Sequence, residues 1–212
     1  MPRITEERRE ARREQILDAA RACLLEHGLE AVSMEMIIAR SGMSTGAVYR
    51  YFKGKDEIIG AAVAASASEI GGAVAPILVN ASTRVPSRLV EELLAAWVDY
   101  SRSGVGAAAG IDRMPAALHG WSYAQTDAEL KAVLRASLRG FREACVPIIK
   151  QWQADGVVAG GVEPDAVAQL LLSISLGFVA QRALTGDAEV EAHAGALAAL
   201  TAGGPQPAAP GA

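Results

Sequence analysis

The sequence predicts an all-α protein. Of its 212 residues 43 are alanine, and aromatic residues make up only 5% although 51% of the chain is hydrophobic. Alanine is the strongest helix former, whereas strands favour β-branched and aromatic side chains. Apolar residues also recur at steps of three and four, the period of a helix. The length is compatible with one or two domains.

Four helices are expected near the N-terminus, over residues 6–27, 33–40, 45–51 and 55–70. In the first, Ile16 and Leu24 share one face, and Gly28 supplies a left-handed stop. Ser33 and Ser44 are good N-caps for the second and third helices. The pair Gly71-Gly72 is expected to end the fourth helix, and residues 73–86, with two prolines, are predicted to be a linker.

The rest of the chain predicts five more helices, over residues 87–101, 107–125, 126–155, 164–184 and 188–201. Pro115 is expected to strain the second of these helices, and Pro147 to kink or split the third. Thr126 begins a capping box with Glu129. Pro164 fits the first position of its helix. The sequence thus predicts an N-terminal domain over residues 1–58, a helical domain over 59–202 and a disordered tail over 203–212.

Charge and composition exclude several classes of protein. The net charge of −4 argues against indiscriminate binding of polyanions. Two cysteines make neither a disulfide framework nor a zinc site, and no cofactor or metal is expected. The first 14 residues lack an apolar core, so no signal peptide is expected. The apolar stretch 170–180 is too short to span a bilayer. We therefore expect a cytoplasmic protein without a membrane partner.

Residues 33–52 predict a helix–turn–helix, a motif whose second helix enters the DNA major groove. Val48 and Phe52 can point to the core, which leaves a polar arc outside. Between residues 36 and 55 there are four basic residues and no acidic one. Hydroxyl and guanidinium groups suit phosphates and base edges. The candidate DNA-binding residues are Ser33, Ser44, Thr45, Gly46, Tyr49, Arg50, Tyr51 and Lys55.

This region resembles the DNA-binding domain of the TetR family of bacterial repressors. The matching pieces are EQILDAARACLLEHG (14–28) and SMEMIIARSGMSTGAVYRYFKGKDEI (33–58), especially SGMSTGAVYRYFKGK (41–55). YRYF followed by Lys55 is the most specific signature, and Ile38 departs from the small alanine usual in the family. The resemblance implies base or phosphate contacts from Thr45, Gly46 and residues 49–51. It also implies phosphate contacts from Ser33, Ser44 and Lys55.

The resemblance also implies a mechanism. Two subunits dimerise through their last helices, and the two reading helices occupy successive major grooves of a palindromic operator. A small-molecule effector enters a cavity in the C-terminal domain and releases the DNA. The effector must then prefer the state that cannot bind DNA.

Aromatic and polar side chains of the C-terminal helices are candidates for lining an effector pocket, since such cavities are apolar with a few polar groups. The alternative is that they are core residues. The candidates are Trp97, Tyr100, Met114, His119, Trp121, Phe141 and Cys145. Their composition predicts a largely apolar effector with one or two hydrogen-bonding groups.

The helix over residues 164–184 is apolar on nearly all sides and needs cover from a partner as well as from its own core. The alternative is the central helix of a monomer. A homodimer is expected, with Leu176, Phe178, Leu197 and Leu200 at the interface.

Two other classes of protein remain as alternatives. An all-helical enzyme would need converging titratable side chains, and no such set or catalytic motif is found, so no enzyme activity is expected. A ligand-independent DNA-binding regulator remains open. So does a helical protein-interaction module, although this leaves the outward residues from Thr45 to Lys55 unexplained. The preferred hypothesis is a ligand-responsive, dimeric DNA-binding regulator that acts as a repressor.

Overall fold

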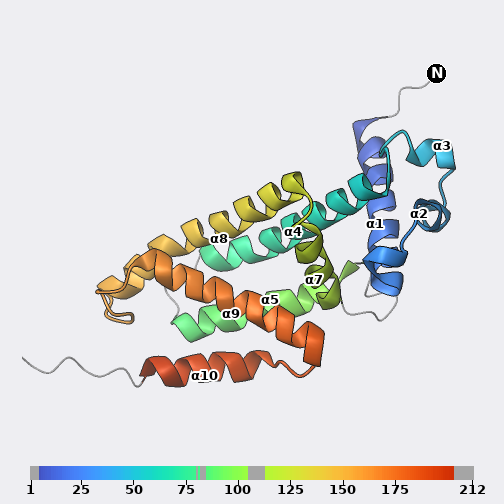
Figure 1. Cartoon of the computed structure of the whole chain (residues 1–212). Helices are drawn as coiled ribbons and strands as arrows, with labels where there is room; N and C mark the ends of the chain where they lie inside the picture. The colour runs from blue at the N-terminus through green and yellow to red at the C-terminus, as the bar shows by residue number, and fades with distance from the viewer. Residues whose placement is uncertain (1–4, 80, 82–84, 105–112, 203–212) are drawn as a thin grey trace, which may run out of the picture. The chain divides into compact units, whose positions relative to one another are not determined.

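The computed structural model describes residues 5–79, 81, 85–104 and 113–202, and these residues form helices and turns with no strand among them (Figure 1). The helices are α1 (Glu6–Ala31), α2 (Met34–Ser41), α3 (Thr45–Val48), α4 (Lys55–Val79), α5 (Pro86–Ser101), α7 (Met114–Tyr123), α8 (Ala128–Ala154), α9 (Pro164–Thr185) and α10 (Val190–Ala202). The all-α prediction is confirmed. The tail over residues 203–212 lies outside the described residues.

The chain divides into two compact units. The first comprises Met1–Ala73 and Val98–Gly140, and the second comprises Val74–Trp97 and Phe141–Ala212. Helices α4, α5 and α8 each contribute residues to both units. The first unit contains the whole of the predicted helix–turn–helix.

The first four helices are joined by one apolar core. Figure 1 shows α2 and α3 beside α1. Side chains from all four helices pack together, and each of them is almost fully buried. They include Ile16, Leu17, Ala20, Cys23, Ile37, Val48, Phe52, Ile58 and Ile59. Ile38, the departure from the family pattern, is half-buried against this core. The core fixes the position of α3 on α1, as a DNA-reading helix requires.

Most expected helix ends in this region are confirmed. Gly28 has a φ of 74° and interrupts α1 where the stop was predicted. The Ser33 hydroxyl accepts a hydrogen bond from the Met36 N–H at 3.3 Å, so Ser33 caps α2 as expected. Gly42 ends α2 with a φ of 65°. The helix α3 is shorter than predicted, because residues 49–51 form a turn.

The predicted linker over residues 73–86 is wrong in its first half. α4 continues through Gly71-Gly72 and contains Pro76 in its interior. Four apolar residues of this segment keep the helical spacing, and all four are half-buried: Ile70, Val74, Ile77 and Leu78. Burial of this face outweighs the helix-breaking tendency of glycine and proline.

Three other expectations about helix ends needed correction or gained detail. Pro115 lies in the first turn of α7, where proline is tolerated, and so does not strain a helix. Asp127, rather than Thr126, caps α8, because its carboxylate accepts the Leu130 N–H at 2.8 Å. α8 runs through Pro147 as one helix and is not split there.

The second unit has its own apolar core. α9 begins at Pro164, as predicted, and ends at Gly186 with a φ of 76°. Phe178 of α9 packs edge-on against His193 of α10, with ring centroids 5.3 Å apart. The other deeply buried side chains of this unit include Leu89, Leu93, Leu94, Cys145, Ile149, Trp152, Leu171 and Val179.

By length and composition, α4 and α9 could each cross a membrane. Core and interface helices of soluble proteins have the same composition, because a helix covered on all sides needs no polar face.

Candidate nucleic-acid interface

Three hydrogen bonds that involve Ser41 hold the turn between α2 and α3. The Gln15 side chain of α1 donates a hydrogen bond to the Ser41 carbonyl at 2.7 Å. The Ser41 hydroxyl donates to the Ile38 carbonyl at 2.8 Å and accepts from the Met43 N–H at 3.2 Å. These bonds satisfy the end of α2 and fix the direction in which the chain enters α3.

α3 and the turn after it separate core side chains from exposed ones. Val48 is fully buried and Phe52 is 3% exposed, so both belong to the core as expected. Tyr49 is 50% exposed, and Thr45, Gly46 and Arg50 are also exposed. The side chains with hydrogen-bonding groups therefore face outward together, as direct reading of base edges requires.

The other candidate residues flank this arc. Ser44 is the N-cap of α3, and its side chain makes no cap hydrogen bond. Tyr51 and Lys55 are half-buried. Ser33 accepts the Met36 N–H, and its hydroxyl also hydrogen-bonds to the Glu35 side chain. Such groups suit phosphate oxygens, which position a protein on the duplex.

The cations near the arc fall into two groups. Arg40 forms a two-pronged ion pair with Glu26, and its hydrogen bonds hold the pKa of that carboxyl below the usual range. In the part of the chain that the structure describes, the side chains of Arg50, Lys53 and Lys55 form no ion pair, although the Lys53 backbone N–H donates to Glu57 Oε2 at 2.6 Å. The sequence prediction omitted Lys53, although its place between residues 36 and 55 marked it as part of the basic stretch. These three cations remain able to contact phosphates.

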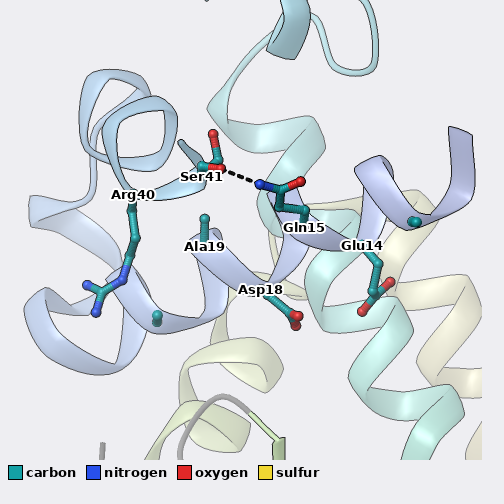
Figure 2. Close-up of a pocket in the computed structure, with 8 residues that line it drawn as sticks. Glu14, Gln15, Asp18, Ala19, Arg40 and Ser41 are labelled. Atoms are coloured by element: carbon teal, nitrogen blue, oxygen red, sulfur yellow. Dashed lines mark hydrogen bonds between the residues drawn. The ribbon is translucent and has the colours of Figure 1, made fainter. Parts of the chain in front are cut away.

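A pocket of about 480 Å³ lies on the outside of α1 and α2 (Figure 2). Two carboxylates, Glu14 and Asp18, line it together with Arg40, Ser41 and small alanines. None of the predicted effector-binding residues lines this pocket. Its acidic groups would also repel a phosphate backbone.

The predicted effector-binding residues occupy different environments. Met114 and Cys145 are buried, whereas His119 is exposed. Within the first unit, Trp121 is half-buried, as is Tyr100, whose hydroxyl accepts a hydrogen bond from Arg113 at 2.7 Å. Trp97 and Phe141, in the second unit, are also half-buried. Their role in binding an effector stays a prediction.

One expected interface residue needs correction. Phe178 is fully buried within a single chain, against His193, and therefore belongs to the core rather than to a dimer surface. Leu176 and Leu197 are half-buried, and Leu200 is exposed. Two exposed leucines of α9, Leu170 and Leu184, were not among the predicted interface residues, and Leu184 is 76% exposed. Their position on a helix without a polar face was the available signal.

Two family models match the chain, one in its N-terminal part and one in its C-terminal part. Residues 16–62 match the family model of bacterial regulatory proteins of the TetR family. Residues 107–203 match the model of the C-terminal region of BetI-type transcriptional repressors. The two matches cover the helix–turn–helix and most of the C-terminal helices.

Relatives of known type agree with these matches. The transcriptional repressor Rv1474c of Mycobacterium tuberculosis is 32% identical over 146 residues, which are 68% of this chain and 73% of that protein. The regulator BetI of Serratia proteamaculans is 31% identical over 91 residues, covering 43% of this chain and 46% of the relative.

Solved structures share the fold. A TetR transcription regulator from Haloarcula marismortui superposes with a TM-score of 0.71 at 21% identity, over 91% of this chain and 97% of its own. The outward arc on α3, the matches to the two family models and the relatives lead to one assignment. The chain belongs to the TetR family and is a helix–turn–helix transcriptional repressor.

Proposed function

We propose that the chain acts as a homodimer that binds a palindromic operator through α3 and is released from it by a small, largely apolar effector. The observation that carries this proposal is the outward arc of Thr45, Tyr49 and Arg50 next to the buried Val48 and Phe52. Repression follows from occupation of the operator in the cytoplasm, where the DNA lies.

The residues of the interface have separate roles. Thr45, Tyr49, Arg50 and Tyr51 face or border the major groove and contact base edges or phosphates. Gly46 has no side chain, so the backbone can approach the DNA closely. The hydroxyls of Ser33 and Ser44 and the ammonium of Lys55 contact phosphates, which fixes the register of α3 on the duplex.

Dimerisation through α9 and α10 is supported by their composition and exposure. α9 has apolar residues on all sides, and Leu170 and Leu184 are exposed on it. Leu200 of α10 is exposed as well. Burying such leucines against a second copy removes their apolar surface from water. A palindromic operator requires two copies of α3 that are related by a two-fold axis and lie about one helical turn apart, near 34 Å.

The effector is proposed to bind among the aromatic side chains of the C-terminal helices. Tyr100 and Trp121, both in the first unit, are half-buried and combine apolar rings with polar tips, which suits a flat or bulky ligand with one or two hydrogen-bonding groups. Linkage requires that the effector lower operator affinity by the same factor by which the operator lowers effector affinity.

DNA binding is tested by fluorescence anisotropy with duplexes from the region upstream of the chain's own gene. Arg50→Ala should weaken specific binding by about 5- to 150-fold, which corresponds to the roughly 1–3 kcal/mol of a good base contact. The matched control is Arg88→Ala, since Arg88 is an exposed arginine of α5 that pairs with Glu91 and Glu92. Equal binding by wild type and Arg50→Ala would refute the assignment of the reading surface.

Dimerisation is tested by sedimentation velocity. Leu184→Arg places a charge on an exposed position, so the subunit should fold but no longer associate. Phe178→Arg is the contrasting variant and should unfold or aggregate, because its side chain lies in the core. A monomeric wild type would contradict the proposed interface.

A further inference from the structure

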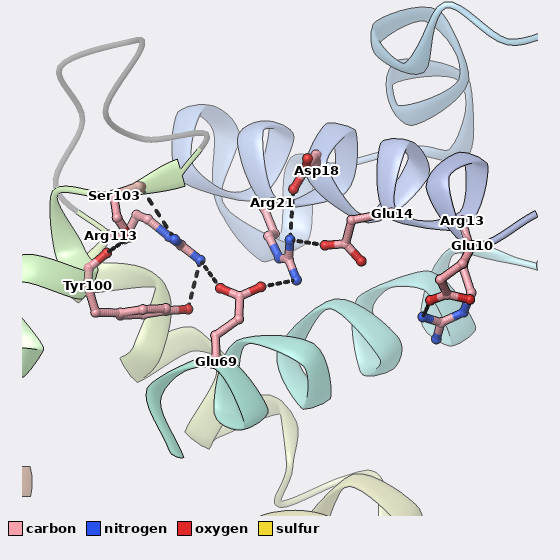
Figure 3. Close-up of polar contacts among 9 residues, drawn as sticks. All are labelled: Glu10, Arg13, Glu14, Asp18, Arg21, Glu69, Tyr100, Ser103 and Arg113. Atoms are coloured by element: carbon pink, nitrogen blue, oxygen red, sulfur yellow. Dashed lines mark hydrogen bonds and ion pairs between the residues drawn. The ribbon is translucent and has the colours of Figure 1, made fainter. Parts of the chain in front are cut away.

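Two buried arginines of the first unit meet at one carboxylate. Arg21 of α1 and Arg113, which precedes α7, have side chains only 7% and 6% exposed. Glu69 of α4 contacts both: its Oε1 lies 2.9 Å from Arg21 Nη2, and its Oε2 lies 3.3 Å from Arg113 Nη2 (Figure 3). Charged side chains are seldom buried so completely unless they are paired. Glu69 therefore bridges α1 and the residue that precedes α7, which are far apart in the sequence.

On the α1 side, Arg21 has further partners. Its Nη1 donates to Glu14 Oε1 and to Asp18 Oδ1, both at 2.7 Å. Burial opposes the charge of Arg21, but the hydrogen bond to Glu14 and the nearby carboxylates more than offset it and raise the pKa of the guanidinium. Arg21 would therefore keep two carboxylate partners if Glu69 were neutralised.

On the α7 side, the Arg113 guanidinium is held by a hydroxyl and a backbone carbonyl. Its Nη2 donates to the Tyr100 hydroxyl at 2.7 Å, and its Nη1 donates to the Ser103 carbonyl at 3.4 Å. Gly104 has a φ of 62°, and a Cβ there would lie 3.0 Å from Arg113 Nη1. Glycine adopts this backbone conformation without strain and leaves room for the Arg113 guanidinium. Among the described residues Glu69 is the carboxylate that pairs with Arg113.

The three residues come from different parts of the family pattern. Arg21 lies within the region matched by the DNA-binding family model, and Arg113 lies within the region matched by the C-terminal model. Glu69 lies between the two matched regions. We propose that Glu69 is a positioning residue that ties α1 of the DNA-binding helices to the segment before α7, so that Arg113 and Tyr100 control operator affinity without touching DNA.

The physical reason is preorganisation. α1 carries the core on which α3 packs, so a tie on α1 restricts the orientations of α3. Without the tie, DNA binding must itself fix the orientation of α1 and α3. The free energy spent on this ordering weakens the binding. A residue that only stabilises the fold would lower the melting temperature and leave the affinity of the folded protein unchanged. The inference rests on the proposed operator binding.

The test is a double-mutant cycle on operator affinity, measured well below the melting temperature of each variant. Arg113→Met should weaken binding by about 2- to 30-fold, the range of residues that couple distant sites. Glu69→Gln keeps the side-chain size and cuts the tie, and should weaken binding to a similar extent. In the Glu69→Gln background, Arg113→Met should then have little further effect, because the tie is already absent.

A matched control and a second variant complete the test. Arg142→Met removes an ion pair with Asp165 in the second unit and should leave operator affinity unchanged. If Arg113→Met does not fold, Arg113→Lys keeps the charge, loses the fork that reaches Glu69 and Tyr100 together, and should weaken binding in the same direction. Fully additive effects, or wild-type affinity in every folded variant, would overturn the inference.

Failure of the proposed function can be told apart from failure of this inference. If the wild type binds no operator, the proposed operator binding fails, and hydrogen exchange in α1 then tests the tie alone. Glu69→Gln and Arg113→Met should both speed exchange in α1 around Arg21, whereas Arg142→Met should not. Unchanged exchange in α1 would refute the tie.

Discussion

Tyr49 and Phe52 lie three residues apart just after α3, and replacing each with alanine should separate DNA binding from folding. Tyr49 is 50% exposed, so about half of the 1.5–3 kcal/mol of a fully buried large side chain is at stake, near 1 kcal/mol. Phe52 is 3% exposed, and removing its ring from the core should cost about 3–5 kcal/mol.

These values predict distinct melting curves. For a protein of this size, 1 kcal/mol shifts the melting temperature by about 2–4 °C. Tyr49→Ala should therefore lower it by only a few degrees, whereas Phe52→Ala should lower it by roughly 6–20 °C or prevent folding.

Operator affinity should respond to Tyr49 out of proportion to its effect on stability. We expect Tyr49→Ala to weaken specific binding by about 5- to 150-fold in fluorescence anisotropy at 25 °C, the loss of one good contact. Tyr49→Phe tests the hydroxyl alone and should leave the melting temperature unchanged. If Tyr49→Ala binds the operator as tightly as the wild type, the outward arc is not the reading surface. If it unfolds like Phe52→Ala, the ring is part of the core.

Three further predictions concern charge and thiols. Lys55→Ala should weaken binding to all duplexes about equally and reduce the slope of log affinity against log salt by about one unit; an unchanged slope would exclude a phosphate contact. Cys23 and Cys145 are buried, and burial raises the pKa of the Cys145 thiol to about 12, so Ellman's reagent should find two thiols only after unfolding. The hydrogen bond from Arg142 lowers the pKa of Asp165 from 3.8, so the pair stabilises the fold above that pH and loses its effect as pH falls below it. Asp165→Asn should therefore melt with a weaker dependence on pH as the pH falls from about 5 through 3.8 and below, and equal slopes would contradict the assignment.

The N-terminal helices were predictable from sequence because their ends depend on local chemistry. Ser33 caps α2 through its own hydroxyl, and Gly28 and Gly42 both have the positive φ that glycine favours. The alternation of Val48 and Phe52 with exposed residues follows from helical spacing. These features need no information from distant parts of the chain.

The errors occurred where tertiary burial decides the outcome. Pro76 predicted a linker, but the half-buried apolar face of α4 extends the helix to Val79. Phe178 was predicted at the dimer interface because its helix is apolar on nearly all sides. Its position on α9 instead directs the ring into the core of its own subunit. Hydrophobicity alone cannot separate these two kinds of burial, because both remove the same surface from water.

The contact between Arg21 and Arg113 through Glu69 also escaped prediction, since it joins segments many residues apart. One local signal existed. Arg21 follows Leu17 by four residues and precedes Leu24 by three, so it falls on the buried face of α1. A charge on such a face requires a partner, but the sequence does not say which helix provides it.

The ion pair between Arg40 and Glu26 has a consequence for how the protein finds its operator. It withdraws one of the four cations between residues 36 and 55 from the DNA and leaves Arg50, Lys53 and Lys55. Since affinity for random duplex grows with the number of phosphates neutralised, the loss of this cation lowers the affinity that the stretch 36–55 contributes on unrelated sequence. In a cell, fewer copies would then be held along the rest of the chromosome, because competition from unrelated sequence depends on this same affinity.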